Sequence, residues 1–570
     1  SADGFSSRHR LALPTQSARA VAAVDLNHDG HCDLIFANAQ DAKSYDTVSY
    51  IYWGSTDGVN IKNRLELPTS GAGAIVVADL GNRQRNDLIF INTIDSLLAS
   101  ATPSSLYYSD KKKPEIFSAR QRVLLETRGL DAYSAADLNL DGLADLVIPD
   151  TSGVSLYWAN PSGFDSKRST RVTSNYSFST RVADFNRDGY LDLLLSEWRP
   201  GSSGTHIYYG GPQGFSSAHR TLIPVGGIRF HTVADFNGDG WIDVAYPVFN
   251  EQKVSIFWNG PDGFSANKRL DLPGRSPVAL EVADLNADGF LDLIVPNLFD
   301  INPPPENKTR AFGGSPKGDV FLYWGSADGY SNEHRTTLPA LGAEDAVVAD
   351  LNRDGRLDLV ITAYHGGTRR DFPSYVYWQG KDGFNPQQVT MLETYSASGA
   401  LAADYNGDGW PDLLFANHHR DGSHRNRSFL YWGGPSGFSK ERRLELPADG
   451  PHLLTAVDAG NTFDRSDDYD YLSPAREFQG ATRLLQMKAR GQEPAGTQIR
   501  FQVRSAKTQE GLATAPWQGP GSNSAYFEME GKQPASSSLA LNGPWLQFRA
   551  RFSNPGGGLP VLESISLELE

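Results

Sequence analysis

The chain has 570 residues, with 67 Asp and Glu against 52 Lys and Arg, which gives a formal net charge of −15 at pH 7. This acidic balance argues against nucleic acid as a partner. The single cysteine excludes disulfide stabilisation, and because no run of 18 apolar residues occurs, we expect no membrane-spanning helix.

Residues 1–460 contain short β-branched and aromatic segments separated by Gly, Asn, Asp and Pro, which predict β-strands. The segments recur in a fixed order of four. The first occurs at 20–24 and 232–234, the second at 33–37, 243–246 and 412–416, the third ends in an aromatic pair and Gly at 52–54, 257–260 and 431–433, and the fourth closes in Leu-Pro at 67–68, 272–273 and 446–447. Four strands per unit of about 50 residues predict the blade of a β-propeller.

The connection between the first and second segments carries a nine-residue pattern, D-x-N-x-D-G-x-x-D, in eight copies. The copies begin at Asp25, Asp79, Asp137, Asp184, Asp235, Asp284, Asp350 and Asp404. Calcium takes about six to eight oxygen ligands, which a tight loop supplies from alternate positions. We therefore predict one calcium ion in each intact copy, held by four side chains and the backbone carbonyl of the seventh residue. An Asx-rich turn without metal is the alternative for any single copy.

Seven copies keep all four side-chain ligands. The predicted ligands are Asp25, Asn27, Asp29, His31 and Asp33; Asp137, Asn139, Asp141, Leu143 and Asp145; Asp184, Asn186, Asp188, Tyr190 and Asp192; Asp235, Asn237, Asp239, Trp241 and Asp243; Asp284, Asn286, Asp288, Phe290 and Asp292; Asp350, Asn352, Asp354, Arg356 and Asp358; and Asp404, Asn406, Asp408, Trp410 and Asp412. The second copy has Asp79, Gly81, Arg83 and Asp87 at the side-chain positions, so we predict that the Arg83 guanidinium replaces the ion there. Seven calcium ions would add 7 × 2 = 14 positive charges and bring the net charge of −15 to about −1.

On these repeats the chain resembles the FG-GAP/VCBS family, the calcium-binding propeller repeats related to those of integrin α-subunits. The resemblance covers about residues 1–458 and implies an all-β fold, an eight-bladed β-propeller with calcium in the strand 1–2 loops. The family includes adhesion proteins, lectins and polysaccharide-degrading enzymes, so the fold does not decide the function. Residues 1–14 resemble an outer strand that closes the ring or packs elsewhere, and a partial ninth unit follows at 452–461. A seven-bladed ring with one displaced unit is the alternative.

After the propeller at 1–460, an acidic linker is predicted at 461–475 and a small antiparallel β-sandwich at 476–570. The acidic run at 464–471 suggests the linker, and alternating apolar and polar residues, as at 499–506 and 545–552, suggest the sandwich. The sandwich is either a packing module or an accessory carbohydrate-binding domain.

The calcium loops also bear on the compartment. Sites of weak to moderate affinity fill at extracellular calcium concentrations and stay largely empty in the cytosol. Ser1 is not an initiator methionine, which suggests a processed or trimmed chain. We therefore expect a secreted, extracellular or periplasmic monomer whose partner is an extracellular polysaccharide or glycan.

The strand 2–3 loops of a propeller lie on the face opposite the calcium loops, and long loops tend to carry function. Those of the seventh and eighth units are long and hold five Arg and four His against two acids, Asp371 and Asp421. A basic patch on an acidic chain points to an anionic ligand, since Arg suits carboxylate and sulfate. The predicted ligand-binding residues are Asn417, His419, Arg369, Arg370, Arg420 and Arg425, together with Arg229 and the potential sugar-stacking Trp198. A solvated loop with incidental charge is the alternative.

A uronate or sulfated polysaccharide is the ligand that we expect, and a lyase reaction is the chemistry expected if it is cleaved. A lyase neutralises the uronate carboxylate with Arg or calcium, removes the C5 proton with a base, and protonates the leaving group. The candidate bases are His365, His418 and His231, and the candidate acids are Tyr364 and Tyr395.

Three alternatives stay open. A glycosidase needs paired carboxylates, and Glu197, Glu281 and Glu344 show no spacing that pairs them. His418, His419 and His424 either bind a transition metal or are surface polar groups. The protein can also be a non-catalytic lectin or cell-adhesion module that binds glycan or protein.

Overall fold

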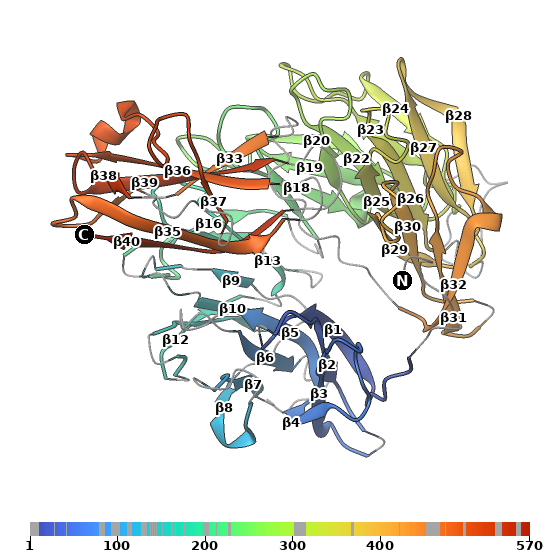
Figure 1. Cartoon of the computed structure of the whole chain (residues 1–570). Coiled ribbons are helices and arrows are strands. Elements are labelled where there is room, and N and C mark those ends of the chain that lie inside the picture. The colour runs from blue at the N-terminus through green and yellow to red at the C-terminus, as the bar shows by residue number, and fades with distance from the viewer. Residues whose placement is uncertain are drawn as a thin grey trace.

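The computed structural model describes residues 11–570 apart from 28, 42, 79–85, 93–102, 111–116, 127–133, 137, 140, 142, 144, 151, 161–162, 166, 175–176, 198–203, 213, 226–229, 301–314, 366–369, 421, 452–467, 474, 494–497, 530–537 and 554–559. The described chain consists mainly of β-strands (Figure 1), so the prediction of an all-β fold is confirmed. Its helices are short 3-10 turns: η2 (Ala119–Gln121), η3 (Phe249–Glu251), η5 (Lys440–Arg442) and η6 (Glu510–Thr514). None of the described helices has the length and hydropathy needed to cross a bilayer.

Eight four-stranded antiparallel sheets follow one another along the described chain, each with its strands in sequence order, and we number them first to eighth. The first is β1 (Ala18–Val24), β2 (Asp33–Asn38), β3 (Asp46–Tyr52) and β4 (Arg64–Ser70); the second is β5 (Ala72–Ala78), β6 (Asp87–Asn92), β7 (Ser104–Tyr107) and β8 (Arg122–Leu125); the third is β9 (Ser134–Ala136), β10 (Asp145–Asp150), β11 (Gly153–Tyr157) and β12 (Ser169–Thr173); the fourth is β13 (Ser177–Ala183), β14 (Asp192–Glu197), β15 (Thr205–Tyr208) and β16 (Arg220–Ile223). The fifth is β17 (Thr232–Ala234), β18 (Asp243–Val248), β19 (Lys253–Phe257) and β20 (Arg269–Pro273); the sixth is β21 (Glu281–Ala283), β22 (Asp292–Pro296), β23 (Val320–Tyr323) and β24 (Arg335–Leu338); the seventh is β25 (Ala343–Ala349), β26 (Asp358–Ala363), β27 (Ser374–Gly380) and β28 (Gly383–Leu392); the eighth is β29 (Ala397–Ala403), β30 (Asp412–Asn417), β31 (Arg425–Tyr431) and β32 (Arg443–Asp449).

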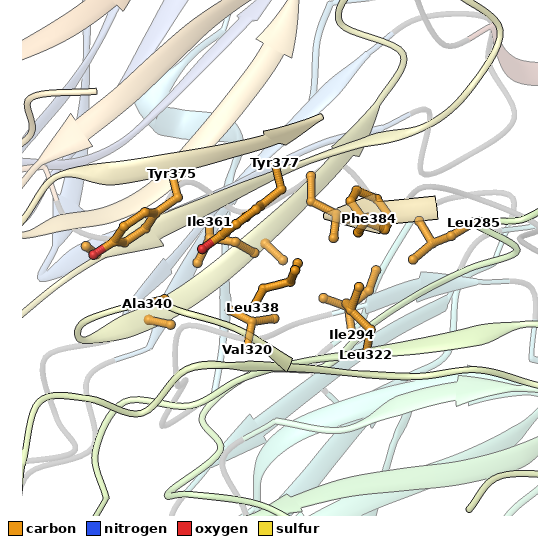
Figure 2. Close-up of a cluster of buried hydrophobic side chains, with 14 of the residues drawn as sticks. Leu285, Ile294, Val320, Leu322, Leu338, Ala340, Ile361, Tyr375, Tyr377 and Phe384 are labelled. Carbon is orange, nitrogen blue, oxygen red and sulfur yellow. The ribbon is translucent and has the colours of Figure 1, made fainter. Parts of the chain in front are cut away.

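The second strand of each sheet is rich in Leu, Ile and Val because sheets pack against both of its faces. Every residue of β6, β14, β18 and β26 is buried. Seven buried clusters join consecutive sheets, from the first and second to the seventh and eighth. Figure 2 shows the cluster in which Val320 and Leu338 of the sixth sheet face Ile361 and Tyr377 of the seventh. Closure of the eight sheets into a ring stays a prediction.

In seven of the eight described sheets, a tyrosine hydroxyl bonds a backbone carbonyl of the chain that precedes the sheet. The hydroxyl of Tyr208 in the fourth sheet donates to the carbonyl of Thr173 in the third at 2.9 Å. The same bond runs from Tyr52 to Pro14, Tyr107 to Pro68, Tyr157 to Glu126, Tyr323 to Pro273, Tyr377 to Pro339 and Tyr431 to Glu393. The fifth sheet has Phe257 at this position and lacks the bond. The Pro14 carbonyl thus occupies the position that the end of the preceding sheet has in the other six bonds. The outer strand expected at 1–14 stays a prediction, because residues 1–10 lie outside the described part and residues 11–14 form no strand.

Removing one of these hydroxyls should weaken the packing between two sheets. We expect Tyr323→Phe to lower the free energy of unfolding by about 1 kcal/mol, because the carbonyl of Pro273 loses the hydroxyl that donates to it. The midpoint of urea unfolding in calcium buffer measures this. Tyr45→Phe is the matched control, because Tyr45 is 42% exposed. Equal destabilisation by the two substitutions would contradict the sheet-to-sheet role.

Two further sheets form a sandwich at the carboxyl end. One contains β33 (Asp468–Leu472), β34 (Arg476–Glu477), β36 (Gln498–Ala506), β37 (Phe527–Glu528) and β39 (Trp545–Ser553), and the other contains β35 (Arg483–Gln492), β38 (Leu539–Ala540) and β40 (Val561–Leu569). Figure 1 shows them as two stacked layers. Met487 of one sheet and Phe501 of the other are fully buried between them.

The structure differs from the predicted linker at 461–475. β33 lies within that range and pairs with β39, so its residues 468–472 belong to the sandwich. Asp470 forms two hydrogen bonds, of 2.7 and 2.8 Å, with Arg551 of β39. Asp470 of the acidic run is therefore a partner of an arginine on the neighbouring strand. Residues 461–467, and the partial ninth unit at 452–461, lie outside the described part of the chain.

Candidate functional site

The predicted calcium loops connect the first and second strands of their sheets. In the first loop, the carboxylate of Asp25 accepts the backbone N–H groups of Asp29 at 3.0 Å and Gly30 at 2.8 Å. Asn27 accepts the N–H of Asp29, and Asp29 accepts that of His31. Gly30 has φ of 86°, a left-handed conformation that favours glycine. The loops that begin at Asp184, Asp235, Asp284, Asp350 and Asp404 repeat the bonds of the first Asp.

The last Asp of the pattern ties the loop to its own sheet. Asp33 is fully buried, and its two oxygens accept the N–H of Leu26 at 2.9 Å and the N–H of Gly54, after the third strand, at 2.7 Å. The second copy keeps this role although Gly81 and Arg83 replace two of its side-chain ligands. Asp87 is fully buried and accepts the N–H of Ser109 at 3.0 Å. The final Asp is thus a structural bracket, whether or not a metal is bound. Asp79, Gly81, Arg83 and Asp137 lie outside the described residues.

The buried, closely spaced carboxylates of the loops provide an electrostatic environment that favours a bound cation. Burial raises the pKa of Asp192, Asp243 and Asp292 to about 7, with a smaller contribution from the first and fifth carboxylates of the same loops. Their donors are carboxylate, amide and carbonyl oxygens, which calcium prefers. In the described part of the chain, no group of three or more His, Cys, Asp and Glu side chains is arranged to hold a metal, and the loop carboxylates accept backbone N–H groups instead. The donor chemistry therefore fits calcium, and its binding stays a prediction.

At the opposite ends of β26 and β30, the strand 2–3 connections of the seventh and eighth sheets bring several predicted residues together, and we call this group the histidine cluster: Tyr364, His365, Arg370, His418, His419 and His424. The Tyr364 ring centroid lies 4.8 Å from that of His365 and 5.9 Å from that of His418. His424 lies 4.6 Å from His418 and 5.0 Å from His419. The Arg370 guanidinium lies 5.5 Å from the Tyr364 ring. The sixth sheet adds Phe299, which lies 5.3 Å from His365 and was not predicted.

Two histidines of the cluster, His365 and His418, are held in their neutral forms. Burial, with a smaller effect of Arg370, lowers the pKa of His365 to about 4. Burial also lowers the pKa of His418. His418 Nδ1 lies 2.9 Å from the carbonyl of Gly450, so Nδ1 carries the proton and Nε2 the lone pair. His418 is therefore able to accept a proton through Nε2.

Tyr395 and Arg420 form a second group beside the cluster. The Arg420 guanidinium lies 4.0 Å from the Tyr395 ring. The Tyr395 hydroxyl donates to Glu393, which also accepts from Arg443 at 3.0 Å and pairs with Lys440 at 2.8 Å. Burial and the Glu393 hydrogen bond raise the pKa of Tyr395 to about 12, so the phenol stays protonated at neutral pH. Nothing in the sequence pattern signalled Glu393.

Asn417, which was predicted to bind ligand, and His231, which was predicted to act as a base, occupy structural positions instead. Asn417 is fully buried, donates to the carbonyl of Arg427 at 2.7 Å and accepts the N–H of Tyr395 at 3.0 Å. Asn38 and Asn297 make the same kind of backbone bonds in the first and sixth sheets, so the assignment of Asn417 as a ligand-binding residue is corrected.

His231 is 3% exposed and lies 2.9 Å from Ser196, between the fourth and fifth sheets. Burial holds its pKa well below the usual value. The surroundings of His231 make it a core residue instead of an accessible base. Arg425 begins β31 and is exposed. Arg229, Arg369 and Trp198 lie outside the described part of the chain.

Comparison with known sequences identifies the repeat. The family model described as an FG-GAP-like repeat matches residues 137–195 and 235–295. Each match begins at the first Asp of a calcium pattern and runs into the second strand of the next sheet. The resemblance inferred from the motifs is thereby confirmed. No curated protein matches the chain.

Solved structures resemble the chain only weakly. An Agrocybe aegerita lectin that recognises non-reducing terminal N-acetylglucosamine is 16% identical over 67% of this chain and 92% of its own, with a TM-score of 0.33. BBS1N in complex with ARL6DN is 13% identical over 79% and 96%, with a TM-score of 0.32. The V. cholerae biofilm matrix protein Bap1 is 13% identical over 78% and 92%, with a TM-score of 0.30. TM-scores this low give no support to transferring any of these functions.

Proposed function

We propose that this FG-GAP-repeat protein is an extracellular, calcium-stabilised β-propeller that binds an acidic polysaccharide at the histidine cluster. The observation that carries the proposal is the convergence of Arg370, His365 and His418 from two neighbouring sheets of a chain whose net charge is −15. A guanidinium among neutral imidazoles and aromatic rings on an acidic protein suits a ligand with carboxylate or sulfate groups.

The geometry supports binding through two arginines backed by rings. Arg370 lies over Tyr364, and Arg420 lies over Tyr395. A guanidinium over a ring directs its N–H groups sideways, where a carboxylate or sulfate can accept two of them. The neutral imidazoles beside Arg370 add polar contacts without requiring a second buried charge.

One observation favours a reaction at this site, the β-elimination of a uronate. Nε2 of His418 carries a lone pair that can remove the C5 proton, because Nδ1 holds the proton of the ring. As the electron pair forms the C4–C5 double bond, the C4–O bond breaks, and Tyr364, whose ring contacts His418, protonates the leaving oxygen. Arg370 would stabilise the charge that develops on the carboxylate.

Binding by the double variant Arg370→Ala/His418→Ala tests the proposal. Calorimetric titration with polygalacturonate and dextran sulfate should show affinity at least about tenfold weaker than that of the unmodified chain, since charged hydrogen bonds are lost. The ultraviolet absorbance of unsaturated products tests the elimination separately.

The double variant Lys381→Ala/His334→Ala is the matched control. Both residues are exposed and lie in strand 3–4 connections, at the other end of the sheets from the cluster. Unchanged affinity in the Arg370 and His418 variant would overturn the assignment of the site. Binding without unsaturated product would leave the protein a lectin.

A further inference from the structure

The outer face of the carboxyl-terminal sandwich carries a group of side chains that the proposed function does not use. Side chains alternate between the two faces of a strand. In β36 and β39, the residues that point into the core are buried, among them Phe501 and Ala550. The alternate residues of the two paired strands are Arg500, Gln502, Arg504, Gln547, Arg549 and Arg551. We call this set the arginine face.

Two aromatic rings lie against the four arginines of this face. The guanidinium carbons of Arg504 and Arg549 lie 4.5 and 5.1 Å from the centroid of the Trp517 ring. Three of the four lie 4.9 to 6.0 Å from the centroid of the Tyr526 ring. All four arginines and both rings are partly exposed. The rings therefore hold the guanidiniums in place while solvent reaches them.

Carboxylates neutralise only one side of the arginine face. Asp470 pairs with Arg551 and also reaches Arg549 at 3.2 Å. The strand register places Glu528 on the same face. Among the side chains that the structure describes there, the arginines therefore outnumber the acids, four to two.

The other side of the face has fewer acids than arginines. Within the described part of the chain, Arg504 pairs with no carboxylate, and Arg500 Nε has no hydrogen-bond partner although Glu528 lies opposite Arg500 in the strand register. Arg504 bonds the neutral amide of Gln547 at 2.8 Å. Burial, with a smaller effect of the neighbouring Arg549, lowers the pKa of Arg504.

We propose that the arginine face is a second binding site, which takes the sulfate or carboxylate groups of an acidic polysaccharide. Arg500 and Arg504 are four residues apart on one strand, or about 13 Å. Their ligand therefore has anionic groups spaced along a chain. Duplex nucleic acid carries one charge per about 1.7 Å of axis, and this density would be repelled by a protein of net charge −15. A polysaccharide with widely spaced charges suits the site better.

The site can be tested in the full chain by calorimetric titration with dextran sulfate and polygalacturonate. The titrations use a background that carries Arg370→Ala and His418→Ala, so that only the sandwich contributes. Adding Arg500→Ala and Arg504→Ala should weaken binding at least about tenfold. Adding Arg483→Ala and Lys488→Ala should leave it within about twofold, because these exposed residues of β35 lie on the other sheet. If the alanine variant fails to fold, Arg500→Gln/Arg504→Gln replaces it.

The outcomes separate this site from the one on the seventh and eighth sheets. If the histidine cluster binds no polysaccharide, the background variant has the same affinity as the unmodified chain. The loss of affinity on adding Arg500→Ala and Arg504→Ala then still measures binding at the arginine face. Equal losses in the β36 and β35 variants would mean diffuse charge attraction and overturn the site. Tighter binding of single-stranded DNA than of either polysaccharide, lost in the β36 variant, would overturn the ligand class.

Discussion

Removing calcium with EGTA is expected to lower the melting temperature of the protein by about 10 °C or more. A site filled at about 100 times its dissociation constant contributes about 2.7 kcal/mol, and seven predicted sites stabilise the same folded chain. Each kcal/mol is worth about 2–4 °C in a domain of 150–250 residues and less in a longer chain. Differential scanning calorimetry before and after EGTA measures the shift, and elemental analysis of the dialysed protein should find about seven calcium ions per chain.

Two substitutions separate the metal from the scaffold. Asp239 contributes to the fifth loop alone, so Asp239→Ala should remove about one calcium ion and reduce the EGTA shift. Asp87 brackets a loop in which we predict no calcium, so Asp87→Ala should lower the melting temperature equally with and without EGTA. Loops that hold no calcium, together with a melting temperature that EGTA leaves unchanged, would contradict the metal sites.

The local structure of the loops was predictable because their Asp, Asn and Gly residues restrict the backbone conformation of the turn. Asp25 caps backbone N–H groups, and Gly30 adopts a left-handed φ of 86°. The two hydrogen bonds by which the last Asp fixes the loop to its sheet were not predicted, because a carboxylate within a metal-binding pattern is interpreted as a metal ligand. Retention of Asp87 in the copy that has Gly81 and Arg83 in place of two ligands was the available signal.

The sequence predicted which loops form the histidine cluster, but it did not predict the roles of single residues in those loops. Asn417 looked like a loop residue because it is polar and follows an apolar strand. The recurrence of Asn38 and Asn297 at the same position indicates a scaffold residue. Burial of His231 depends on packing between sheets, which sequence spacing does not reveal. The strand at 468–472 was missed because its acidic composition outweighed its alternating pattern.

Metal-free protein is expected to become more stable as the pH falls from 8 to 6.5, above the range in which the buried neutral His231 and His365 begin to oppose the trend. The pKa of Asp192, Asp243 and Asp292 is about 7 in the folded chain, against an ordinary value of 3.8. The folded state therefore binds protons at a pH where the unfolded chain does not, and above pH 7 each ionised carboxylate costs about 4 kcal/mol. That cost falls as the pH drops below 7 and is gone below about 4.

Calcium should reverse this dependence, because protons and the ion compete for the same carboxylates. The test is the melting temperature across pH 5–8 of EGTA-stripped protein in calcium-free buffer and of the same protein with calcium restored. Asp243→Asn removes one of the loop carboxylates whose pKa burial raises, and should reduce the pH slope of the metal-free protein. A metal-free melting temperature that falls between pH 8 and 6.5 would mean that the buried carboxylates are stabilised as anions by the protein itself, and then no electrostatic reason would remain for the loops to bind a cation.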